Sequence, residues 1–155
     1  MEDKLAIISR RILKPILGKN KLALERATKY KNIMVSQGIK ARLGTFIGGE
    51  LNNCLQLTAI YSDMTTATKS FTELSKNEEI MKMMSTREDD PSGYLIGPEV
   101  YRTILGQPSG DHNILLIREY EVDRKYIPQT IELLNKVEEI VKDEDTKVLA
   151  LYPII

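Results

Sequence analysis

The chain has 155 residues, of which 42% are hydrophobic and 28% charged, and this size and composition predict a single domain with a buried core. The chain has 22 lysines and arginines and 22 aspartates and glutamates, so its formal charge is zero. It also has no basic stripe, and we therefore expect neither a nucleic acid nor an anionic membrane as a partner. Cys54 is the only cysteine, which excludes an intrachain disulfide and a thiolate metal cluster.

The start of the chain (MEDKLAIISRR) places two acids ahead of only four consecutive apolar residues. A secretory signal needs a basic start and a longer apolar run, and a membrane-spanning helix needs about 20 apolar residues. We therefore expect no signal peptide, no membrane partner and a cytoplasmic location.

A strand and a helix are the first expected elements. Residues 5–14 (LAIISRRILK) carry apolar side chains on both faces and stop at Pro15, which predicts a central strand. Apolar residues spaced by four, three and four positions within 21–37 predict an amphipathic helix. We expect Asn20 to cap its start and Gly38 to end it in the left-handed conformation.

A hairpin and a second helical region follow. Two extended runs, 41–47 and 53–62, flank the Gly-Gly-Glu turn at 48–50 and predict a β-hairpin. Asp63 is suited to cap the next helix, whose pattern weakens at 75–77 and then resumes. This break predicts a kink or a second short helix.

The next segment begins with a loop-like composition. Residues 85–93 (STREDDPSG) predict a loop, and 94–105 predict a strand in which Pro98 requires an edge position or a bulge. Residues 106–111 (GQPSGD) predict a joint between two parts of the domain.

The rest of the chain predicts strand, helix and strand. Residues 114–122 (ILLIREYEV) form an apolar run typical of a strand, and Pro128 marks the first turn of an amphipathic helix. Residues 146–151 (TKVLAL) predict the last strand.

The expected element order is therefore β-α-β-β-α-β followed by β-α-β. The first six elements match the ferredoxin-like split βαβ unit, an α+β fold with an antiparallel sheet and its helices on one face. We expect one domain over 1–155, with this unit in 1–106 and a half-repeat in 112–155. The half-repeat has no strand between its two strands, and an open edge is unfavourable. Either the first unit or a second chain would fill the gap, and we favour a homodimer.

Several of these features together resemble the NIPSNAP-like branch of the dimeric α+β barrel superfamily. They are Leu13-Lys14-Pro15 at a strand end, the Gly18-Lys19 pair, the glycine-rich hairpin, and Ile60-Tyr61-Ser62-Asp63-Met64 leading into a helix. The resemblance covers residues 5–105, with a weaker echo in 114–151. It implies a sheet whose helix-free face lines a cavity closed by a dimer mate. Haem-degrading relatives use a tryptophan that this chain lacks, so haem degradation is not expected.

Candidate ligand-binding residues are arginines and tyrosines on predicted strands, namely Arg11, Arg42, Tyr61, Tyr101 and Arg102. A cation beside apolar neighbours can face a cavity and hold a carboxylate or a phenolate. The alternative is that these arginines lie at the rim of the sheet, paired with Glu99 or Glu119.

His112 is the only histidine, and its polar surroundings favour a solvated turn residue over a general base or a haem ligand. We retain it as a sixth candidate for the ligand site. One histidine excludes a multi-histidine zinc or iron site, and we expect neither a metal nor a cofactor.

The sequence contains no phosphate-binding glycine loop and no G-x-S-x-G elbow, so no catalytic set can be named. Three functions remain open. The first is a small-molecule-binding protein of the dimeric α+β barrel type. The second is a cofactor-free monooxygenase or isomerase acting on a small apolar or aromatic substrate. The third is an assembly protein without a ligand.

Overall fold

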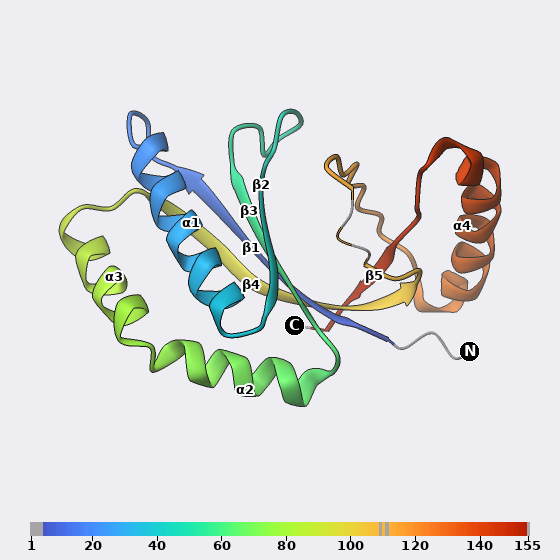
Figure 1. Ribbon diagram of the computed structural model, residues 1–155. Helices are drawn as coiled ribbons and strands as arrows, with labels where there is room; N and C mark the ends of the chain where they lie inside the picture. Colours follow the sequence, from blue (N-terminus) through green and yellow to red (C-terminus); the bar gives the residue numbers. More distant parts are fainter. Residues whose placement is uncertain (1–4, 109, 111, 155) are drawn as a thin grey trace.

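The computed structural model describes residues 5–108, 110 and 112–154 (Figure 1). In chain order the elements are β1 (Ile7–Pro15), α1 (Asn20–Ser36), β2 (Lys40–Thr45), β3 (Leu55–Tyr61), α2 (Met64–Ser75), α3 (Glu78–Asp89), β4 (Gly93–Leu105), α4 (Ile127–Val141) and β5 (Ala150–Pro153). Short 3-10 helices at Arg124–Tyr126 and Lys142–Glu144 flank α4.

One antiparallel sheet of five strands organises the protein, in the order β2-β3-β1-β4-β5. Strand β3 lies between β1 and β2, the two strands that α1 connects, as the split βαβ unit requires. The expectation of an α+β fold with an antiparallel sheet is confirmed, and the arrangement is consistent with a ferredoxin-like class.

Helices α1, α2 and α3 lie on one face of this sheet, which we call the helix face (Figure 1). Strand β3 shows why, because its residues alternate between buried and half-buried positions and the buried set points toward the helices. The core between sheet and helices consists of Ile7, Ile33, Met34, Ile39, Leu57, Ala59, Tyr61, Ala67, Leu74, Ile80 and Val100. The opposite face, which we call the open face, lacks these three helices.

Local capping explains most helix boundaries. The Asp63 carboxylate accepts a hydrogen bond from the Thr66 N–H at 2.7 Å, and Asn77 caps α3 in the same way, so the break predicted at 75–77 is the start of a separate helix. Gly38 has φ +80°, as expected for a residue that ends a helix. The predicted Asn20 cap is wrong, because Asn20 is already helical and Lys19 precedes it without a side-chain cap.

Helix α3 runs on to Asp89, so most of the loop predicted at 85–93 is helical. The Arg26 guanidinium on α1 donates to the Asp90 carbonyl at 2.6 Å. This tertiary contact stabilises the helix end and outweighs the loop-like composition. Pro98 lies, as predicted, beside a register shift in the β1–β4 pairing. Strand β5 pairs only with residues 101–105 of β4, so Pro98 is also on an open edge.

The C-terminal part departs most from the prediction. Residues 114–122 form no strand and pair with none of the five strands of the sheet. The last strand begins at Ala150 rather than at residue 146. The half-repeat is therefore not formed as a βαβ unit. The predicted joint at 106–111 includes residues 109 and 111, which lie outside the described residues.

Helix α4 also departs from the expectation that all helices share one face. It stands apart from α1, α2 and α3, beyond β5 at the right of Figure 1, and none of its residues is buried. Within the part of the chain that the structure describes, no helix has both the length and the apolar character needed to cross a membrane.

Candidate functional site

Arg11 lies on the helix face of β1, where the sheet meets α1 and α2. Its guanidinium carbon lies 5.7 Å from the centre of the Tyr30 ring on α1 and 5.6 Å from the centre of the Phe71 ring on α2. The strand alternation places Ser9 on the same face, and the β1–β3 register sets Ile7 opposite Tyr61. A cation is therefore held between two aromatic rings above the centre of the sheet.

Two buried hydroxyl groups accompany this cation. Ser9 is fully buried and Tyr61 is 4% exposed, and the Tyr61 ring contacts Phe71 edge-on with 5.6 Å between centroids. Burial raises the pKa of the Tyr61 phenol, and the nearby Ser9 hydroxyl and the Arg11 charge only partly oppose this rise. The phenol therefore stays protonated at neutral pH and is available as a hydrogen-bond donor.

The polar atoms of this cluster have few hydrogen-bond partners within the protein. The buried Nη1 of Arg11 has no hydrogen-bond partner among the described residues, the Ser9 and Tyr61 hydroxyls interact only with each other, and no described acid forms a salt bridge with Arg11. Buried polar groups in proteins are ordinarily paired, and buried charges almost always. A group with acceptor oxygens, such as water or a carboxylate, has the chemistry to pair with this guanidinium and these hydroxyls.

A second polar cluster lies on the open face, where the register aligns Arg10 with Glu99. The Arg10 Nε donates to Glu99 at 2.8 Å, and its Nη2 donates to the Tyr101 hydroxyl at 2.8 Å and to Glu119 at 3.0 Å. Burial lowers the pKa of Arg10, but the bonds to Glu99 and Glu119 more than offset it, so the pKa is raised. This cluster is internally satisfied, and burial also raises the pKa of Tyr101.

The other predicted residues lie elsewhere. The Arg42 guanidinium donates to the backbone carbonyl of His112, and the His112 ring is hydrogen-bonded to the carbonyl of Asp145 at 2.9 Å. Arg102 is exposed near the β4–β5 pairing, with its guanidinium carbon 5.3 Å from the centre of the Tyr152 ring.

The structure therefore divides the six predicted residues between two faces. Only Arg11 and Tyr61 come together beside unpartnered polar atoms. Ser9, Tyr30 and Phe71 complete that cluster and were not predicted, although Ser9 is two positions from Arg11 and shares its face in any strand. Glu99 and Glu119 do pair with an arginine, but that arginine is Arg10 and not Arg11, Arg42 or Arg102.

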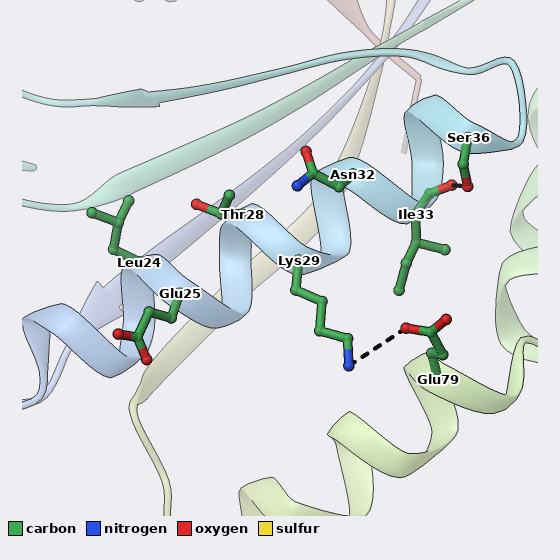
Figure 2. Close-up of a pocket in the computed structure, with 8 residues that line it drawn as sticks. All are labelled: Leu24, Glu25, Thr28, Lys29, Asn32, Ile33, Ser36 and Glu79. Carbon is green, nitrogen blue, oxygen red and sulfur yellow. Dashed lines mark hydrogen bonds and ion pairs between the residues drawn. The ribbon is translucent and has the colours of Figure 1, made fainter.

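Two surface grooves lie away from these clusters. The larger, of about 610 Å³, lies between α1 and α3 and is lined by Leu24, Glu25, Thr28, Lys29, Asn32, Ile33, Ser36 and Glu79 (Figure 2). Lys29 and Glu79 pair across it at 3.5 Å. The second, of about 510 Å³, is lined by Glu121, Val122, Asp123 and Tyr126. None of the six predicted residues lines either groove.

Comparisons with protein families and with curated sequences found no match. No protein-family model matches the chain, and no curated protein has a significantly similar sequence. Within the described residues, no group of three histidine, cysteine or acidic side chains is placed to hold a metal ion. Architecture and site thus define an α+β protein with an antiparallel sheet and a cationic, aromatic cluster beneath its helices.

Proposed function

We propose that the protein binds a small molecule through an anionic group, a carboxylate or a phenolate, held by Arg11 beneath α1 and α2. The observation that carries this proposal is the buried Nη1 of Arg11, which has no partner among the described residues and lies on the same face as the buried hydroxyls of Ser9 and Tyr61. A carboxylate has acceptor positions for a guanidinium and for two hydroxyl donors, so one anionic group can satisfy all three.

The surroundings favour an apolar or aromatic body on the same ligand. Tyr30 and Phe71 provide flat ring surfaces beside the guanidinium, and the buried residues around them are apolar. Ligand sites in proteins ordinarily combine apolar surfaces with a few convergent polar groups, and this cluster contains side chains of both kinds. The proposal retains the cytoplasmic location and the dimeric α+β barrel type expected from the sequence, but it places the ligand on the helix face, whereas the resemblance implies a cavity on the helix-free face.

Benzoate is the appropriate first probe, with neutral benzamide as its control ligand. At about ten times its Kd, benzoate is expected to raise the free energy of unfolding by about 1.4 kcal/mol. For a chain of this size that corresponds to a rise in Tm of about 3–6 °C. Benzamide has a similar shape but no charge, and it is expected to leave Tm unchanged.

The variant Arg11→Met is expected to abolish the response to benzoate, and Tyr61→Phe to weaken it. Lys14→Met is the matched control, because it removes one positive charge from an exposed position of the same strand. An equal response to benzoate in Arg11→Met and Lys14→Met would contradict the proposal. A mass spectrum of the purified protein under native conditions tests the same site for a retained ligand.

A further inference from the structure

Residues 112–122, between β4 and α4, form a segment without regular structure that we call the strap. It contains no helix or strand and pairs with none of the five strands of the sheet. Every residue from 113 to 122 is exposed, and the apolar side chains of Ile114 and Leu116 are 82% and 81% exposed. The strap therefore buries little surface of its own and gains little from the hydrophobic effect.

Polar contacts from the sheet hold the strap over the open face. At its start, the Arg42 guanidinium on β2 donates to the backbone carbonyl of His112. Further along, the Arg10 Nη2 on β1 donates to the Glu119 carboxylate at 3.0 Å. The register aligns both arginines with Thr58 of β3, so they lie on the same face of the sheet. The strap is thus fixed to the open face near each of its ends.

Contacts of this kind do not offset the entropy lost by ordering the whole segment. Every residue held in one backbone conformation loses entropy, and a strand recovers this loss through ladder hydrogen bonds and buried side chains. The strap has neither, and the Arg10–Glu119 ion pair is open to water because the Glu119 side chain is 74% exposed. A segment with so few buried contacts opens more readily than the sheet beneath it.

We infer that the strap detaches and reattaches as one unit while the sheet stays folded, and that the Arg10–Glu119 ion pair is its latch. Strand β1 is paired on both sides by other strands, and its core lies on the helix face, so the sheet does not depend on the strap. Detachment leaves Arg10 bonded to Glu99 and to the Tyr101 hydroxyl. The latch can therefore open without leaving a buried charge unpaired.

Detachment of the strap opens the part of the open face around Arg10. Ile8 and Ile12 flank Arg10 on this face of β1, because side chains alternate along a strand. The strap thus controls how far a cation with apolar neighbours is accessible from solvent. It lies on the face opposite to Arg11, so this inference stands or falls independently of anion binding.

Backbone amide chemical shifts of residues 112–122, measured by NMR, test the inference. If the strap moves as one unit, all its amides report the same ratio of detached to attached strap. Glu119→Gln keeps the shape of the latch side chain and removes its charge, and we expect it to raise this ratio about 2- to 5-fold. Arg42→Met is expected to raise the ratio at the same amides, and the amides of α1 are expected to stay unchanged in both variants.

Glu121→Gln is the matched control, because it removes the same charge from an exposed residue two positions along the strap. It is expected to leave the ratio at the wild-type value. Raising the salt concentration from about 0.05 M to about 0.5 M should raise the ratio in the wild type but not in Glu119→Gln, because salt screens the ion pair.

The inference is overturned if Glu119→Gln gives the same ratio as Glu121→Gln. It is also overturned if Glu119→Gln and Arg42→Met each change only the amides beside the substituted contact, because the strap would then not move as one unit. A change that extends to the amides of α1 would overturn it as well, since the strap would then not open separately from the folded core.

Discussion

Replacing Arg11 by methionine tests the unpartnered cluster through stability alone. The substitution keeps a long side chain between the Tyr30 and Phe71 rings and removes only the guanidinium. In an ordinary core, removing a buried arginine breaks a salt bridge and leaves the acid buried and unpaired, which costs about 3–5 kcal/mol. No acid described by the structure pairs with Arg11, so this cost does not arise.

The magnitude follows from the contacts. The substitution removes the penalty of a buried donor without a partner, about 1–3 kcal/mol. It also removes two cation–π contacts, in which the guanidinium carbon lies 5.7 Å from the centre of the Tyr30 ring and 5.6 Å from that of Phe71. Each contact contributes about 0.5–1 kcal/mol, and the methionine sulfur recovers part of this by contacting the same rings. We therefore expect the free energy of unfolding of Arg11→Met, without ligand, to lie between the wild-type value and about 2 kcal/mol above it.

Urea unfolding followed by circular dichroism measures this difference, provided that the m-value is unchanged. Lys14→Met, an exposed position on the same strand, should stay within about 0.5 kcal/mol of the wild type. A loss of more than about 2 kcal/mol in Arg11→Met would refute the reasoning. Such a loss would mean that the guanidinium stabilises the fold itself and that no outside group is needed.

Two further predictions concern Tyr61 and Gly97. The pKa of Tyr61 is raised in the folded state, so above a pH of about 10 the phenol ionises in the unfolded chain first, and stability is lost as the pH rises toward the folded pKa. Tyr61→Phe should therefore lose less stability than the wild type between neutral pH and pH 11 or so, as measured by Tm, and equal losses would contradict the assignment. Gly97 has φ +94°, and an added Cβ would lie 2.8 Å from the Arg10 carbonyl oxygen. We therefore expect Gly97→Ala to lower the free energy of unfolding, measured in urea, by about 1–3 kcal/mol. Gly44→Ala is the control and should lower it less, because a Cβ at Gly44 would have no atom within 4 Å.

Capping residues, glycines and apolar alternation predicted most elements in the first two thirds of the chain, because these features act through interactions within a few residues. The Asp63 cap satisfies N–H groups within its own helix turn, and a glycine with φ +80° at Gly38 ends a helix wherever it occurs. Alternation along 55–61 fixed which residues of β3 face the core. The prediction for Asn20 was wrong because a side chain can cap a helix only from the position before its first residue, and α1 already begins at Asn20.

Prediction failed where the outcome depends on a distant partner. Residues 114–122 have the composition of a strand, but strand formation also requires a neighbouring strand alongside, and the sequence pattern does not state whether the fold supplies one. The site shows the same limit. Arg10 and Arg11 are neighbours in a predicted strand, so alternation assigns them to opposite faces. Only the packing of α1 and α2 decides that Arg11 is the one enclosed with aromatic rings and that Arg10 is the one paired with acids.

Two unusual features of this protein lie on opposite faces of β1. On the helix face, buried polar atoms around Arg11 lack partners, and on the open face a strand-like segment anchored by Arg10 lacks a ladder. Natural sequences are otherwise locally consistent, and such departures gather at functional sites. Under the proposed function a small anion completes the first, because a carboxylate can accept hydrogen bonds from the guanidinium and from the neighbouring hydroxyls.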